Sequence, residues 1–248
     1  MTSLANKVAL VTAGSRGLGA QIVTELASRG ADVAFTYASQ KQAADELVAR
    51  IEDFGRRAVC FPADARDFSL AHEVTEEVRR RLGELDILVC SAGIARGGAT
   101  WKLTENDWDD VVDVSLKGAF NYIHAAAPMF VDRKGGKIVC IGSINGLRGR
   151  MGSLSYNVAK AGLVGLVKTV AAEMGKYNVN ANVVAPGYIE TTTQVNTPEL
   201  IKDLVLKECA IKRLGTPQDI APVVAFLCSE EARHVTGQVI KGDAGQYL

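Results

Sequence analysis

The strongest constraint on the fold is the regular alternation of short apolar runs with longer amphipathic stretches along the chain. Strands that alternate with helices in this way predict a parallel sheet with helices on both faces. The run at 85–90, LDILVC, is almost continuously apolar, which is typical of a strand covered on both sides. The sequence therefore predicts an α/β fold, a Rossmann-type doubly wound parallel sheet of about seven strands. The expected strands are 7–12, 32–37, 58–61, 85–90, 137–141, 179–184 and 238–241.

The expected helices fill the intervals between these strands. A glycine follows the second and third of them, as is usual at helix C-termini. The long helix at 105–131 has Thr104 as its expected N-cap, and Pro128 is expected to bend or end it. The stretch at 190–210 is weakly apolar and is expected to be a helical excursion. The other expected helices are 17–29, 40–54, 68–82, 153–175 and 217–229.

Bulk composition limits the classes of partner. The 248 residues contain no linker or internal repeat, so one domain over 1–248 is expected. Lys plus Arg and Asp plus Glu both number 28, so no net field draws the chain to nucleic acid or to an anionic membrane. No apolar run approaches the roughly 20 residues of a membrane span. The N-terminus lacks a signal-peptide core, and the five cysteines form no CxxC, which predicts buried thiols in the cytoplasm.

Three glycines stand where the first expected strand turns into the first expected helix. Gly14, Gly17 and Gly19 would let the backbone approach a pyrophosphate, whose charge is met by free N–H groups at the helix N-terminus. A glycine turn alone can also be a packing turn. Its place at the start of a series of βαβ units favours nucleotide binding. The other residues of this turn are Ser15, Arg16 and Leu18.

The second expected strand bears on the choice of cofactor. An acidic residue about 20 positions after the glycines would select NAD. Tyr37 holds that place, and Asp32 lies at the wrong end of the strand. Arg16 could pair with a 2′-phosphate through its planar guanidinium, with help from Ser39 and Lys41. NADP(H) is therefore favoured, and NAD(H) stays as the alternative.

Asp64 and Ala65 follow the third expected strand. At this edge of the sheet they are candidates for contact with the adenine. An aspartate just before a helix is also a common N-cap, and this alternative stays open for Asp64.

A tyrosine, a lysine and a serine form a candidate proton-transfer site. Tyr156 and Lys160 are four residues apart, so on a helix they share one face. Ser143 lies at the end of the expected strand 137–141. An unperturbed tyrosine has a pKa of about 10. A nearby ammonium favours the phenolate and is expected to move this pKa toward neutrality, where acid–base catalysis is efficient.

These patterns together resemble the short-chain dehydrogenase/reductase family, in particular its 3-oxoacyl-carrier-protein reductase type. The resemblance covers nearly the whole chain, and the spacing of the serine and the Tyr-xxx-Lys pair is its most specific part. It implies hydride transfer between a nicotinamide and the carbon of a carbonyl or secondary alcohol. The matching segments are TAGSRGLG at 12–19, CSAG at 90–93, the set Ser143, Tyr156 and Lys160, and APGYIET at 185–191.

The resemblance also implies roles for single residues. Tyr156 would donate the proton in the reductive direction, and Ser143 would hydrogen-bond the substrate oxygen. Lys160 would lower the tyrosine pKa and hold the nicotinamide ribose. An alkoxide that forms on hydride arrival needs donors already aimed at it, so the chemistry of these residues agrees. The remaining implied cofactor residues are Ser91, Ala92, Gly93, Pro186, Gly187, Ile189 and Thr191, with 190–210 as the substrate lid.

The chain departs from the family pattern at three positions. Ala13 replaces the first turn glycine, and its methyl narrows the room beside the phosphates. Ser91 replaces an asparagine that helps to hold the local strand. Ser115, in DVSLKG, replaces the asparagine that positions a water in the proton relay. A serine hydroxyl is shorter, so the relay through Ser115 is left open.

The resemblance leads to an NADPH-dependent carbonyl reductase, acting on a ketone that could be a 3-oxoacyl thioester. An NAD-dependent secondary alcohol dehydrogenase and a catalytically weak NADP-binding regulatory protein are the alternatives. Carrier-protein recognition in the family uses basic residues; Arg133 and Lys134 match one such place, and Ala172 leaves the other empty. Analogy implies a homotetramer. No metal site is expected, since the histidines are scattered. The candidate walls of the substrate pocket are Ile94, Asn145, Leu147, Met151 and Tyr188.

Overall fold

A computed structural model describes residues 3–191 and 197–248 of the chain. Seven strands form one parallel sheet in the order β3-β2-β1-β4-β5-β6-β7, which confirms the predicted doubly wound architecture. The order reverses between β1 and β4, and in such sheets ligands bind outside the carboxyl ends of the strands at this point. The strands are β1 (Val8–Val11), β2 (Asp32–Tyr37), β3 (Ala58–Pro62), β4 (Ile87–Cys90), β5 (Gly136–Ile141), β6 (Val179–Pro186) and β7 (Val239–Gly242).

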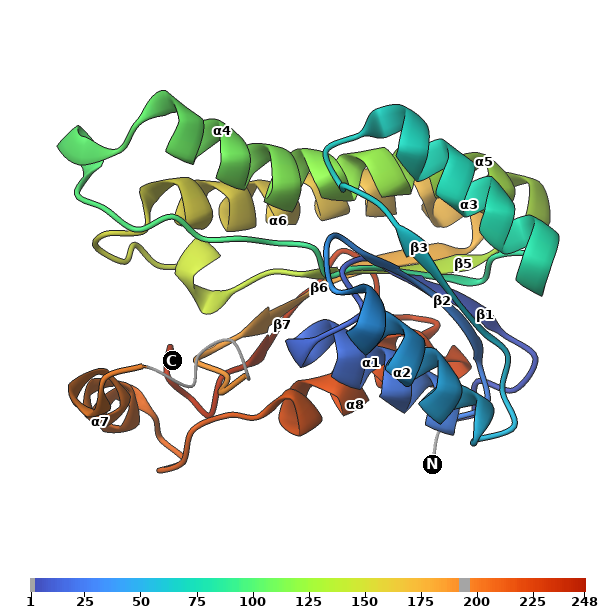
Figure 1. The fold of residues 1–248 in the computed structure, drawn as a ribbon. Coiled ribbons are helices and arrows are strands. Elements are labelled where there is room, and N and C mark those ends of the chain that lie inside the picture. The colour runs from blue at the N-terminus through green and yellow to red at the C-terminus, as the bar shows by residue number, and fades with distance from the viewer. Residues whose placement is uncertain (1–2, 192–196) are drawn as a thin grey trace.

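The helices cover both faces of the sheet (Figure 1). One layer contains α1 (Gly17–Ser28), α2 (Lys41–Glu52) and α8 (Pro217–Leu227), and the other contains α3 (Phe68–Leu82), α4 (Glu105–Val112), α5 (Gly118–Arg133) and α6 (Leu154–Met174). Each layer buries its own apolar cluster against the sheet. Burial of this kind, at about 25 cal/mol per Å² of apolar surface, is the main source of folding free energy.

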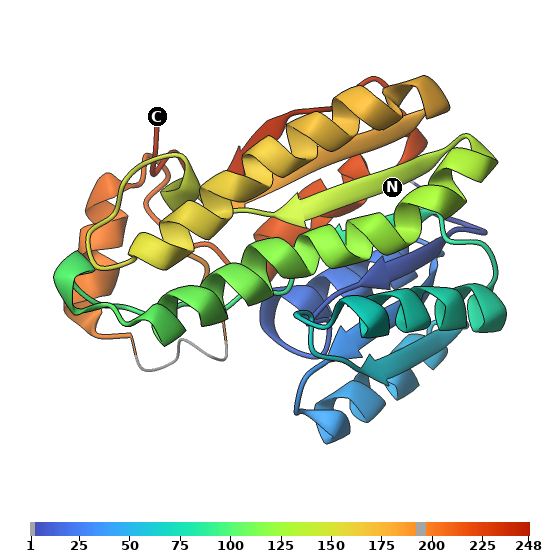
Figure 2. The same ribbon diagram turned by 90° about the horizontal axis from the view of Figure 1, so that it is seen from above.

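The predicted long helix at 105–131 is interrupted. A π-helical turn, Asp113–Lys117, joins α4 to α5, and Figure 2 shows the two helices running on as one rod beside α6. The turn places Ser115 on the buried side. Of the two effects expected of Pro128, a bend or an end of the helix, the second was wrong, because α5 continues to Arg133. Single π-turns occur often at functional sites.

The excursion predicted at 190–210 contains the short helix α7 (Glu199–Glu208), which stands apart from the sheet at its carboxyl edge (Figure 1). The C-terminus lies beside α7 in the same view. Residues 192–196, which belong to the proposed lid, lie outside the described residues. In the described part of the chain, no helix is both long enough and apolar enough to cross a membrane.

Candidate active site

The glycine turn after β1 leaves no room for side chains at two of its glycines. A Cβ at Gly14 would lie 2.5 Å from Cβ of Phe35, and one at Gly19 would lie 2.3 Å from the carbonyl oxygen of Ala13. Gly17 opens α1 with a φ of +54°. Ala13, which replaces the family glycine, also adopts a positive φ of +52°. An alanine in this left-handed region carries a strain of about 1 kcal/mol that a glycine would not.

Two threonines hold the strand ends around this turn. Thr12 Oγ1 accepts hydrogen bonds from the N–H groups of Ser91 at 2.9 Å and Ala92 at 3.0 Å. Thr36 Oγ1 accepts from the N–H of Ala13 at 3.0 Å. The sequence reasoning missed both threonines, although their place at the carboxyl ends of β1 and β2 was a usable signal. Thr12 thus connects the end of β1 to the loop after β4 at Ser91, the position where the family has an asparagine.

The end of β2 carries no acidic group. Tyr37 is buried there, and Ser39 follows it on the surface. Arg16 is exposed at the N-terminus of α1 and makes no ion pair with any residue that the structure describes. Lys41 pairs with Asp45 at 2.6 Å on the surface, and its contribution to phosphate binding stays a prediction. These residues fit a cofactor that carries a 2′-phosphate beside Arg16.

Asp64 does not cap the helix that follows β3. The cap of α3 is Asp67, whose side chain accepts from the N–H of Leu70, so the capping alternative for Asp64 was wrong. Arg66 binds the Asp64 carboxylate at 2.6 Å and holds its pKa below the usual value. Asn121, which the sequence reasoning missed, donates to the carbonyl of Ala65 at 2.9 Å and so fixes the loop.

The predicted trio converges at the carboxyl end of β5. Ser143 is buried just after the strand, and its hydroxyl interacts with the Tyr156 phenol from α6. Lys160, one turn further along α6, is only 4 % exposed, and its Nζ lies 5.7 Å from the centre of the Tyr156 ring. Lys160 Nζ donates to the carbonyl of Ile141 at 2.7 Å. The three side chains therefore stand together at the edge of the sheet where the glycine turn lies.

The electrostatics of this trio differ from the expectation. Burial raises the pKa of Tyr156, and the interaction with Ser143 opposes this rise without cancelling it. Burial also lowers the pKa of Lys160 to about 8. The expectation that Lys160 brings the tyrosine pKa toward neutrality was wrong for the protein by itself, because loss of water is the larger effect on both groups.

Ser115 lies close to this trio across Gly93. A Cβ at Gly93 would stand 3.1 Å from Lys160 Nζ and 3.5 Å from Ser115 Oγ. The Ser115 hydroxyl accepts from the N–H of Ile94 at 3.3 Å. Gly93 thus packs against both polar groups, and the π-helical turn is what brings Ser115 to this place.

The segment after β6 faces the glycine turn. A Cβ at Gly17 would lie 3.7 Å from Cβ of Thr191. Gly187 follows Pro186, and its N–H donates to the carbonyl of Gly242 at 3.1 Å. Within the described residues, neither the N–H nor the C=O of Ile189 is used by another group. A donor and an acceptor on one residue suit a carboxamide, so this segment fits a nicotinamide.

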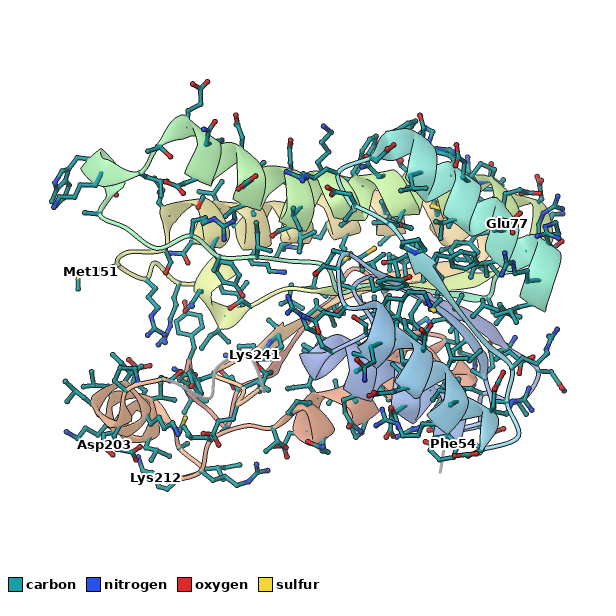
Figure 3. All side chains as sticks on the ribbon, in the orientation of Figure 1. Phe54, Glu77, Met151, Asp203, Lys212 and Lys241 are labelled. Atoms are coloured by element: carbon teal, nitrogen blue, oxygen red, sulfur yellow. The ribbon has the colours of Figure 1, made fainter. Side chains whose placement is uncertain are left out.

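The predicted pocket walls divide into two groups. Ile94, Asn145, Leu147 and Tyr188 are half-buried, and the N–H of Asn145 donates to Ser143 Oγ at 3.1 Å. Met151 is 98 % exposed and points into solvent at the tip of its loop (Figure 3). Gly152, with a φ of +73°, follows it. In this position Met151 contacts no wall of the site that the structure describes, and its place in the substrate pocket stays a prediction.

Two further observations concern metals and cysteines. Among residues 3–191 and 197–248, no three His, Cys, Asp or Glu side chains gather in a way that could hold a metal ion. All five cysteines are free thiols, and only Cys60 is not fully buried.

Comparison with known proteins gives the family. Residues 12–246 match the family model described as enoyl-(acyl carrier protein) reductase. The chain is 37 % identical to 3-oxoacyl-[acyl-carrier-protein] reductase of Staphylococcus epidermidis, over 98 % of this chain and 100 % of the relative. It is 36 % identical to acetoacetyl-CoA reductase of Shinella zoogloeoides, over 98 % and 99 % of the two chains. The chain therefore belongs to the short-chain dehydrogenase/reductase family.

Solved structures of this family superpose closely on the chain. A short-chain dehydrogenase from Burkholderia cenocepacia in complex with NADP has a TM-score of 0.93 at 35 % identity, covering 98 % of each chain. A blue fluorescent protein from a metagenomic library in complex with NADPH has a TM-score of 0.94 at 37 % identity, covering 99 % of this chain and 100 % of that one. This member of the short-chain dehydrogenase/reductase family is accordingly an oxidoreductase with a Rossmann fold.

Proposed function

We propose that this protein uses NADPH to reduce a ketone to a secondary alcohol, and that its substrate is a 3-oxoacyl thioester. The observation that carries the proposal is the convergence of Ser143, Tyr156 and Lys160 at the carboxyl end of β5. The named activities of the Staphylococcus epidermidis and Shinella zoogloeoides relatives support the thioester.

The cofactor preference rests on the two ends of the nucleotide site. NADPH supplies a hydride to the carbonyl carbon when it is bound. Arg16 would bind its 2′-phosphate, because no carboxylate stands at Tyr37 to repel that group. The cradle of Gly14, Gly17 and Gly19 would hold the pyrophosphate at the N-terminus of α1. Ile189 and Thr191 would hold the carboxamide.

The chain's own residues handle the proton. Tyr156 would donate its phenolic proton to the substrate oxygen, and the Ser143 hydroxyl would hydrogen-bond the same oxygen as negative charge develops there. A tyrosine with a raised pKa stays protonated and so remains a donor at neutral pH. Lys160 would hold the ribose and stabilise the phenolate that proton donation leaves behind, before the phenol is reprotonated from solvent.

Recognition of the thioester carrier has less support. Arg133 is bound to Asp86 at 2.8 Å and lies before β5, whereas Ser143 follows β5. Within one chain, Arg133 and Ser143 therefore lie at opposite ends of β5. We propose a thioester of either acyl-carrier protein or coenzyme A, working in the cytoplasm, where the five free thiols would stay reduced.

The test is the rate of nicotinamide oxidation with acetoacetyl-CoA and with a simple ketone, each with NADPH and NADH. We expect turnover with NADPH, at a higher kcat/KM for the thioester than for the ketone. A preference for NADH would refute the cofactor assignment, and turnover of the simple ketone alone would refute the thioester. Absence of turnover with every pair, in a protein that binds NADPH, would refute the reductase.

A further inference from the structure

The C-terminal segment meets the mouth of the candidate site through one buried amide. The Gln246 side chain is 6 % exposed. Its Oε1 accepts from the N–H of Tyr188 at 3.0 Å, and its Nε2 donates to the Glu208 carboxylate at 2.8 Å. The oxygen and the nitrogen of this amide are thus both hydrogen-bonded, to residues that lie 58 and 38 positions before Gln246 in the sequence.

Arg148 completes a ring around Gln246. Its Nη2 donates to Glu208 Oε2 at 2.8 Å, and its Nη1 donates to the main-chain carbonyl of Gln246 at 3.4 Å. Tyr247 adds a contact on the same side, with its hydroxyl 3.5 Å from the carbonyl of Leu147. Charged hydrogen bonds of this kind are stronger than neutral ones.

The three partners come from three parts of the site. Arg148 is in the loop that begins at Ser143, Tyr188 is in the turn between Gly187 and Ile189, and Glu208 is the last residue of α7. Figure 1 shows the C-terminus between α7 and the loop that follows β5. A Cβ at Gly187 would lie 2.7 Å from Gln246 Oε1, so the amide packs directly against that turn.

The proton-transfer residues do not depend on this ring. Ser143 follows β5 directly, and Tyr156 and Lys160 are fixed by α6. Loss of Gln246 would remove the acceptor from the N–H of Tyr188 and the amide donor from Glu208, which weakens the attachment of α7 and of the turn at 187–189. The N–H of Ala210 would still donate to the carbonyl of Ala244, so the helix would loosen without detaching. The consequence would fall on substrate binding rather than on the proton donor.

We propose that Gln246, together with Arg148 and Glu208, is a positioning latch that holds α7 against the mouth of the site and sets the affinity for the substrate. This inference rests on the proposed ketone reduction for its kinetic readout. The latch itself has a structural readout, the hydrogen exchange of the Tyr188 amide, which needs no activity.

The experiment compares Gln246→Ala with Gln218→Ala. Gln218 is a surface glutamine whose side chain, among residues 3–191 and 197–248, bonds only to Gln21. In Gln246→Ala we expect the KM for acetoacetyl-CoA to rise about tenfold, with kcat within about threefold of the unaltered protein. The Tyr188 amide should exchange faster. Gln218→Ala should change neither quantity. Unchanged Tyr188 exchange, or faster exchange with an unchanged KM, would overturn the latch.

If Gln246→Ala folds poorly, a second pair of variants at Glu208 tests the same latch. Glu208 is half-exposed, so Glu208→Ala should fold, and it should raise the KM in the same way. Glu208→Gln keeps an acceptor oxygen for Arg148 and should stay within about threefold of the unaltered KM. Equal KM values in the two variants would overturn the latch. If no variant or parent turns over any ketone while Tyr188 exchange responds to Gln246→Ala, the proposed reaction fails and the structural latch stands.

Discussion

Burial sets the protonation of the two titratable residues at the centre of the site. The Tyr156 phenol keeps its proton because its pKa is raised, and Lys160 loses its charge more easily than an exposed lysine. The aligned carbonyl of Ile141 accepts a hydrogen bond from Lys160 Nζ but brings no full negative charge to it. A phosphate or ribose bound nearby would change the pKa values of Lys160 and Tyr156. Cofactor binding is thereby linked to the protonation of the proton donor.

The Lys160 pKa predicts a pH profile for reduction. Below about 8 the lysine is charged and can stabilise the phenolate, and above about 8 it is neutral. We expect kcat/KM for the ketone to be level up to about pH 8 and then to fall by about tenfold per pH unit. In Lys160→Arg the guanidinium stays charged. The fall should therefore move to higher pH in that variant. A fall at the same pH in both proteins would contradict this origin.

Arg16 predicts the discrimination between the two nicotinamides. Arg16→Ala should raise the KM for NADPH by about tenfold and leave the KM for NADH nearly unchanged, because only NADPH carries the phosphate that the guanidinium binds. Steady-state kinetics with both cofactors measures this. Lys41→Ala is the comparison variant: its ammonium pairs with Asp45 on the surface, so it should raise the KM for NADPH less than Arg16→Ala does. Equal losses for both cofactors in Arg16→Ala would show that Arg16 does not read the phosphate.

At the scale of elements, the site depends on strand ends that are tied to one another. Thr12 connects β1 to the loop after β4, and the π-helical turn after α4 brings Ser115 against Gly93. Neither connection could be predicted from the sequence, because neither arises from the periodic spacing of apolar residues.

Thr12→Val tests the first of these ties. Valine keeps the shape of threonine, so the change removes the acceptor and leaves two part-buried N–H groups without it. We expect the free energy of unfolding to fall by about 2–4 kcal/mol, as measured by urea denaturation. Thr169→Val, at an exposed helical position, should change it by no more than about 0.5 kcal/mol. A loss for Thr12→Val as small as this control would mean that Thr12 does not hold the loop.

For the whole molecule, the parallel sheet and the helices on both of its faces were predicted from the alternation of strands and helices. The order β3-β2-β1-β4-β5-β6-β7 was first given by the structure. The trio of Ser143, Tyr156 and Lys160 was also accessible, since a strand end and a helix turn fix its members. The direction in which the Tyr156 pKa shifts could not be predicted from the sequence, because it depends on how much water each side chain loses in the folded protein. The exposure of Met151 was not predictable for a related reason, because the path of a loop follows no periodic pattern in the sequence.

The homotetramer stays a prediction, in which pairs of helices from neighbouring subunits bury against each other. Sedimentation velocity should give about four times the chain mass of 26.4 kDa. Val158, exposed on α6, should lie in such an interface, so Val158→Glu should lower the assembly state. Phe54, equally exposed at the end of α2, is the control (Figure 3). A monomeric parent, or dissociation caused by Phe54→Glu rather than by Val158→Glu, would contradict this arrangement.

The reaction itself depends on one phenolic proton. The most direct measurement is the turnover of NADPH with acetoacetyl-CoA by Tyr156→Phe, together with the Kd of NADPH for the same variant. We predict that kcat falls by about 10²–10⁴ while the Kd changes by less than about threefold, because the phenol donates the proton and does little to bind the cofactor. Turnover equal to that of the unaltered protein would contradict it.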